Sequence, residues 1–205
     1  MPTHPLWNPY EVPDLDQIAA VRLAPQAPEV VEVVAPDPSW PAVFDGVRDR
    51  LARALGDRAL SIEHVGSTAV PGLWAKPVID VDLTVADSAD EPSWLPDVEA
   101  LGFELRVREP EWEEHRFLKS MAPEVNLHVW SRGAREPRRH RAFRDWLRAH
   151  DDDRARYADV KRSVAARGFD DAMLYNNEKA WVVYDIYERI FAADPAHEHD
   201  PRPRG

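Results

Sequence analysis

Two aspartates, Asp80 and Asp82, stand two residues apart within the apolar run Val78 to Val85. Side chains two apart on a strand point to the same face, so both carboxylates are expected to aim at one spot. Neighbouring carboxylates repel each other unless a cation lies between them. Hard oxygen ligands favour Mg²⁺, with Mn²⁺ as the alternative, and protein-bound Mg²⁺ commonly also binds substrate phosphates.

The competing interpretation is a strand edge that carries two solvated carboxylates. The residues that flank the aspartates argue against it, because residues 79, 81, 83 and 85 are all apolar and fill one face of the expected strand. We therefore predict a metal site at Asp80 and Asp82, which would serve phosphate chemistry.

A turn that could bind phosphates precedes this strand. Gly66 has no side chain to block its backbone N–H groups, and Ser67 adds a hydroxyl. Lys76 stands just before the acidic strand, where Pro77 favours an extended backbone that would direct the ammonium towards phosphates. The competing interpretation of Lys76 is an ordinary solvated loop lysine.

The order Val65-Gly66-Ser67, twelve further residues and then Asp80-Val81-Asp82 resembles the nucleotidyltransferase signature. The run EHVGSTAVPGL at residues 63–73, followed by Ala75-Lys76-Pro77, is similar without a gap to the GrpB family, which is also found fused to some dephospho-CoA kinases. Blocks at 127–129, 139–148 and 157–162 also resemble that family. The resemblance implies an α+β fold with a nucleotidyltransferase-like mixed β-sheet flanked by helices, followed by a C-terminal helical part.

His128 departs from the nucleotidyltransferase pattern, because it stands where a third carboxylate would be expected on a neighbouring strand. A neutral imidazole can ligate a metal or act as a general acid or base. It cannot supply the negative charge that gathers two Mg²⁺ ions. Three outcomes therefore stay open: one metal is bound, His128 activates the nucleophile, or catalysis has been lost. A packed or surface histidine is the competing interpretation.

Cationic side chains gather in the C-terminal third. Arg141, Arg144 and Arg148 fall on one helical face at steps of three and four residues, and we predict that Arg141 and Arg144 bind phosphates. Ion pairs with neighbouring aspartates are the equally weighted alternative. The family resemblance implies that these helices close over the site, which makes Lys161 and Lys179 further candidates for phosphate contacts.

The composition limits the classes of partner. The net charge of −11, with 37 acidic and 26 basic residues, argues against a surface that grips nucleic acid. No apolar run approaches the ~20 residues of a membrane span. The absence of cysteine excludes a thiol nucleophile and fits a cytoplasmic protein.

Four segments are expected along the chain of 205 residues. They are a partly disordered leader at 1–28, a nucleotidyltransferase-like sheet domain at 29–133, a helical part packed on it at 134–192 and a disordered tail at 193–205. The predicted strands lie at 30–34, 59–65, 78–85, 103–108, 116–120 and 125–130. The predicted helices lie at 37–56, 93–101, 138–150 and 154–166, with a long final helix after Asp170-Asp171.

The leading functional hypothesis is a metal-dependent nucleotidyltransferase that moves a nucleoside monophosphate from an NTP to a small acceptor. The alternative is a non-catalytic module of the same fold that binds a nucleotide or coenzyme A. A phosphohydrolase that uses the same metal is a third interpretation. The base of the nucleotide and the acceptor depend on the shape of the pocket, which the sequence does not give.

Overall fold

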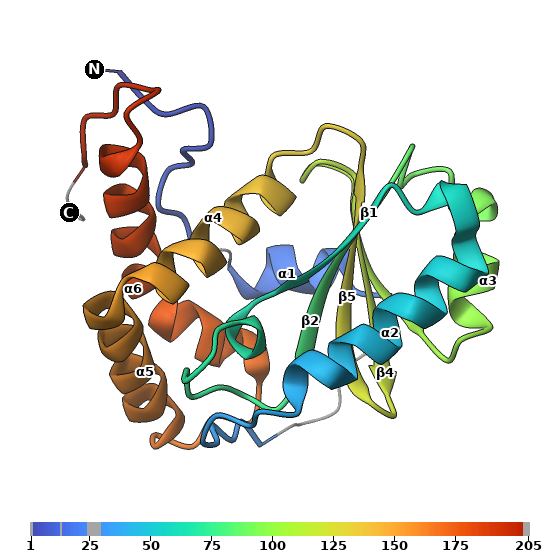
Figure 1. The fold of residues 1–205 in the computed structure, drawn as a ribbon, viewed down its shortest axis with the longest axis horizontal. Coiled ribbons are helices and arrows are strands. Elements are labelled where there is room, and N and C mark those ends of the chain that lie inside the picture. The colour runs from blue at the N-terminus through green and yellow to red at the C-terminus, as the bar shows by residue number, and fades with distance from the viewer. Residues whose placement is uncertain (1, 13, 24–29, 203–205) are drawn as a thin grey trace.

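The computed structural model describes residues 2–12, 14–23 and 30–202. A mixed β-sheet is flanked by helices and followed by a helical C-terminal part, which confirms the predicted α+β, nucleotidyltransferase-like class (Figure 1). The strands are β1 (Ser61–Val65), β2 (Ile79–Val85), β3 (Glu104–Glu109), β4 (His115–Met121) and β5 (Glu124–Ser131). The helices are α1 (Leu15–Val21), α2 (Trp40–Leu55), α3 (Leu95–Glu99), α4 (Glu136–Ala149), α5 (Asp151–Ala165) and α6 (Ala172–Ala193). No helix within the described ranges is long and apolar enough to cross a membrane.

The strand order of the sheet is β1-β2-β5-β4-β3, with β2 and β5 parallel and the other pairs antiparallel. The parallel register places Asp80 opposite Asn126 and Asp82 opposite His128. Residues paired across neighbouring strands present their side chains to the same face. The polar residues of β2 and β5 therefore share one side of the sheet.

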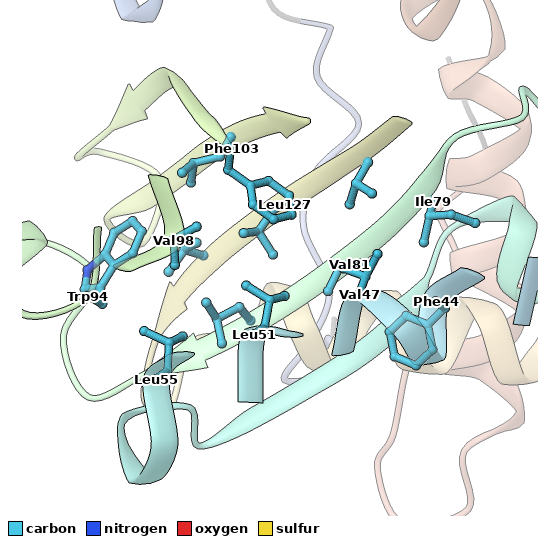
Figure 2. Close-up of a cluster of buried hydrophobic side chains, with 14 of the residues drawn as sticks. Phe44, Val47, Leu51, Leu55, Ile79, Val81, Trp94, Val98, Phe103 and Leu127 are labelled. Carbon is cyan, nitrogen blue, oxygen red and sulfur yellow. The ribbon is translucent and has the colours of Figure 1, made fainter. Parts of the chain in front are cut away.

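The opposite face of the sheet forms the main hydrophobic core. Alternate residues of β2 and β5 point towards α2 and α3, whose apolar side chains cover them (Figure 2). On α2, Phe44, Val47, Leu51 and Leu55 recur at helical spacing and all are buried. Burying these apolar stripes against the strands fixes which face of β2 remains for the aspartates.

The three C-terminal helices pack together beside the sheet (Figure 1). A second apolar cluster joins them to the segment that follows the Gly66-Ser67 turn. Its buried members are Val70, Leu73, Leu147, Tyr157, Ala158, Val182 and Ile186. This cluster holds α4 and α5 close to the Gly66-Ser67 turn, so the helical part packs beside the turn.

Two segments differ from, or add to, the sequence predictions. Residues 30–34 form no strand; Val34 makes a single bridge with Ala75, and the N–H of Val31 bonds to Phe169. Residues 194–202, for which the sequence predicts disorder, contact the N-terminal segment, as in the bond from His4 to Asp194. The leader contains α1, while residues 24–29 and 203–205 lie outside the described residues.

A buried histidine joins the core face to the turn. The His64 ring stacks on Phe44 at 4.6 Å between centroids, and its Nε2 lies 3.0 Å from the Thr68 hydroxyl. That hydroxyl donates to the carbonyl of Val78, so Nε2–H of His64 is the donor to Thr68. Burial, with the nearby charges of Arg148 and Arg144, lowers the pKa of His64 to about 4.

This pKa predicts a pH dependence of stability. Because the folded-state pKa lies below the ordinary 6.5, the unfolded chain binds the proton more readily. The contribution of neutral His64 is therefore complete above pH 6.5 and falls by about 3 kcal/mol as the pH drops towards 4. In urea unfolding from pH 8 to 4, His64→Gln should lose less stability than the wild type. Parallel curves for the two proteins would contradict this assignment.

Candidate functional site

The polar face of the sheet centres on Asp80 and Asp82 of β2. Asn126 of β5 donates from Nδ2 to Oδ1 of Asp80 at 2.8 Å, as the register of the two strands requires. Burial raises the pKa of the Asp80 carboxyl, although the Asn126 hydrogen bond and the charges of His140, Lys179 and Lys76 oppose the rise. A bound cation would stabilise a carboxylate in this position, and the metal role of Asp80 stays a prediction.

Gly66 lies directly against Asp80. Its backbone has φ 67° and ψ −167°, a region that essentially only glycine occupies. A Cβ placed there would stand 2.2 Å from Oδ2 of Asp80, closer than any non-bonded contact allows. The turn therefore brings backbone directly up to the carboxylate, with no side chain between them.

Asp82 is only 1% exposed and is held by two donors. Trp130 of β5 donates from Nε1 to Oδ1 at 3.0 Å, and Nδ1 of His140 on α4 lies 2.9 Å from Oδ2. Burial by itself would raise the pKa of Asp82, but the charge and hydrogen bond of His140 lower it overall. Burial would likewise lower the pKa of His140, and the neighbouring Asp82 raises it. The two groups therefore favour an ion pair.

His128 faces the same space as the aspartates, since it stands opposite Asp82 in the register and its ring lies 6.0 Å from that of His140. Burial lowers the pKa of His128 to about 3; the neighbouring His115 and His140 add to the shift, and Asp82 opposes it. His128 is thus neutral at physiological pH. A neutral imidazole can act as a base or a ligand, and the catalytic role of His128 stays a prediction.

Lys161 of α5 joins the turn to the helical part. Its ammonium donates to the Ser67 hydroxyl at 2.9 Å and to the carbonyl of Trp74, and it lies 4.4 Å from the centre of the Tyr157 ring. Burial and the charge of Lys179 hold the pKa of Lys161 well below its ordinary value, while Asp80 opposes the shift. Both lysines therefore lie close enough to Asp80 to affect its charge, and Lys161 also contacts the predicted phosphate turn.

The arginine face of α4 binds protein groups. Arg144 donates to the Glu63 carboxylate at 3.0 Å and to the carbonyl of His64, and it also pairs with Asp145. Arg148 donates to the carbonyl of Ala69. Arg141 lies 4.0 Å from Glu63 and is more exposed. The phosphate role of Arg141 and Arg144 stays a prediction, and any phosphate at Arg144 would compete with these internal partners.

Four residues of the site were missed as functional candidates: Asn126, Trp130, His115 and His140. Strand parity could have indicated Asn126 and Trp130, because both share the parity of His128 on β5. His140 lies within a block that resembles the GrpB family, but nothing in its local pattern shows that α4 turns it towards Asp82.

Three groups at the joined termini bring possible ligand atoms within 4.8 Å of one another: His4, Asp194 and His197. The N–H of Leu6 donates to Nδ1 of His4, so Nε2 carries the proton that His4 donates to Asp194. A protonated Nε2 cannot bind a metal. This cluster is therefore a hydrogen-bonded link between the two ends of the described chain.

The contact between Gly66 and Asp80 can be tested with a matched pair of substitutions. Gly66→Ala introduces both an unfavourable positive φ and the overlap with Asp80, whereas Gly72→Ala at φ 77° meets no atom within 4 Å. Because both glycines have positive φ, the difference comes from the overlap with Asp80, and we expect Gly66→Ala to lower the free energy of unfolding by about 1–3 kcal/mol more than Gly72→Ala. Chemical denaturation measures both, and equal losses would show that Asp80 does not restrict residue 66.

Comparisons with known proteins agree with the fold and the motifs. Residues 30–189 match the family described as GrpB protein. A UPF0157 protein of Halalkalibacterium halodurans is 44% identical over 179 residues, which cover 87% of this chain and 91% of that protein. A dephospho-CoA kinase of Mycolicibacterium paratuberculosis is 33% identical over 212 residues, which cover 91% of this chain and 51% of the kinase.

Among solved structures, the crystal structure of the conserved protein GrpB from Enterococcus faecalis is similar in fold. It covers 76% of this chain and 99% of that chain, with a TM-score of 0.62 at 24% sequence identity. The family matches cover most of the chain and include the Gly66-Ser67 turn and the Asp80-Val81-Asp82 strand. The chain belongs to the GrpB family.

Proposed function

We propose that this protein binds a nucleoside triphosphate with Mg²⁺ or Mn²⁺ and transfers the nucleoside monophosphate to a small acceptor. The observation that carries the proposal is the side-chain-free approach of the Gly66 backbone to Asp80, next to a second carboxylate at Asp82. A turn of this kind admits phosphate oxygens, and paired carboxylates suit a hard divalent cation.

Each residue of the candidate site has a distinct role in this proposal. Asp80 and Asp82 would hold the cation, which would neutralise the phosphates and favour attack on phosphorus. The Gly66-Ser67 turn would donate to the phosphates, and the charges of Lys161 and Lys179 near Asp80 would balance the remaining negative charge. His128, which is neutral, would accept the proton of the attacking hydroxyl.

The second candidate function is a module that binds a nucleotide or coenzyme A without catalysis. The hydrogen bonds and the burial of Asp82 favour it. The two oxygens of Asp82 already accept bonds from Trp130 and His140, and the side chain is almost fully buried. His128 also replaces the third carboxylate of the nucleotidyltransferase pattern. The match to half of a dephospho-CoA kinase makes coenzyme A and its precursors reasonable probes.

Thermal unfolding tests the shared site. A ligand at 100 times its Kd stabilises the folded state by about 2.7 kcal/mol, which for a chain of this size raises the melting temperature by about 5–10 °C. We expect ATP, GTP, CTP or UTP with Mg²⁺ to produce such a rise in the wild type and in Asp159→Asn, an exposed control on α5. Asp80→Asn should show little of it. Equal rises in all three proteins would remove Asp80 from the site.

Turnover separates the two candidates. The stabilising nucleotide is incubated with Mg²⁺ and a pool of small metabolites, and pyrophosphate release is measured. A transferase should release pyrophosphate in the wild type, and His128→Gln should be slower by about 10²–10⁴ while still binding the nucleotide. Binding without pyrophosphate release in either protein would support the non-catalytic module and contradict the transferase.

A further inference from the structure

A chain of hydrogen bonds leads from His128 to the edge of the sheet. Nδ1 of His128 on β5 lies 3.0 Å from Nε2 of His115 on β4, and Nδ1 of His115 lies 2.6 Å from a carboxylate oxygen of Glu109 on β3. His115 is 2% exposed, whereas the side chain of Glu109 is 27% exposed. The series of hydrogen bonds therefore begins beside the candidate site and ends at a carboxylate that reaches solvent.

When both imidazoles are neutral, the chemistry of the groups assigns a direction to these hydrogen bonds. An ionised Glu109 can only accept, so Nδ1 of His115 carries a proton and donates it. In neutral His115 the other nitrogen, Nε2, is then an acceptor, and it must receive its hydrogen bond from Nδ1–H of His128. Neutral His128 is thereby left with an unprotonated Nε2, and this nitrogen is its basic atom.

Aromatic packing holds the two imidazoles in place. The ring of His115 stacks on Trp130 at 4.3 Å and on His128 at 5.1 Å, and Trp112 meets its edge at 4.9 Å. The ring of Phe117 lies 5.3 Å from that of His128. Trp130 also binds Asp82, so the same rings position the carboxylate and the histidine chain.

The loop between β3 and β4 adds a second constraint. Glu113 and Glu114 both adopt positive φ, at 53° and 55°, a strained conformation for residues other than glycine. Glu113 compensates by accepting from the N–H groups of Arg135 and Glu136 at the start of α4 and from the Arg135 side chain. The loop that ends at His115 is thus fastened to the helix that carries His140.

We propose that Glu109 and His115 are positioning residues that make Nε2 of His128 the basic nitrogen of the site and carry the proton onward. The proposal rests on the transferase function proposed above. An acceptor hydroxyl gives its proton to Nε2 of His128 while its oxygen bonds to phosphorus and pyrophosphate leaves. The Nδ1 proton of His128 passes to Nε2 of His115. The imidazolium formed at His115 still donates a hydrogen bond from Nδ1 to Glu109, and the negative charge of Glu109 balances the positive charge of His115.

The remaining charged groups that face His128 are Asp82 from β2 and His140 from α4. These two bind each other, and no hydrogen bond of the Glu109–His115–His128 chain involves either. The Glu109–His115–His128 hydrogen bonds and the Asp82–His140 pair are therefore separate groups of interactions on the same face of the sheet.

The ¹⁵N NMR shifts of the imidazoles at neutral pH test the tautomers without any substrate. In the wild type we expect a protonated Nδ1 and an unprotonated Nε2 at His128. His115→Phe keeps a ring to stack on Trp130 but removes the acceptor, so His128 should change to the Nε2–H tautomer that free imidazole side chains favour. A wild-type His128 with the proton on Nε2, or an unchanged tautomer in His115→Phe, would overturn the proposal.

Glu109→Gln provides a second variant with a smaller change in volume. An uncharged amide accepts from His115 more weakly than a carboxylate, so His115 and His128 should both show mixed tautomers. Glu104→Gln, an exposed position on the same strand that pairs with Arg106, is the control and should leave both shifts unchanged. If His115→Phe does not fold, mixed tautomers in Glu109→Gln support the proposal and unchanged ones overturn it.

Pyrophosphate release then distinguishes this inference from the proposed function. In an active wild type, Glu109→Gln should lower kcat by about 10-fold or more with little change in KM, whereas Glu104→Gln should match the wild type. Full activity in Glu109→Gln would overturn the relay and leave the transferase standing. If the predicted tautomers are found in a protein that shows no turnover, the positioning of His128 by Glu109 and His115 stands. The proposed transferase function is then contradicted.

Discussion

The buried carboxylate of Asp82 is the interaction on which the arrangement of the site depends. It lies in the middle of β2 and accepts hydrogen bonds from Trp130 of β5 and from His140 of α4. A buried carboxylate without partners is costly, so these donors must stay in place for the fold to be stable. The ion pair with His140 thereby joins the sheet domain to the helical part across the candidate site.

The candidate site consequently belongs to neither part alone. The sheet supplies the aspartates and His128, the turn supplies Gly66 and Ser67, and the helices supply Lys161 and His140. The apolar cluster around Tyr157 and Ile186 keeps the helices against the turn. Substitutions in that cluster would therefore alter the site without touching any of its polar groups.

Local sequence patterns were sufficient to predict those elements whose formation depends on residues close together in the chain. The apolar spacing of 79, 81, 83 and 85 identified the core face of β2 and hence the shared face of Asp80 and Asp82, and helical periodicity gave α2 and α4 to α6 within a few residues. The strand predicted at residues 30–34 was wrong, because β-branched composition indicates only a preference for extended backbone. A strand also requires a partner strand along its length, and in this segment only Val34 forms a bridge.

The sequence by itself determined the family, the two aspartates on one face and the glycine turn before them. Tertiary structure alone decided which partners those groups have, because the contacts join residues far apart in the chain. Asp82 meets His140 only once α4 docks, and Arg144 is directed to Glu63 by the same docking. The Glu109–His115–His128 chain likewise crosses three strands whose register is set by the whole sheet.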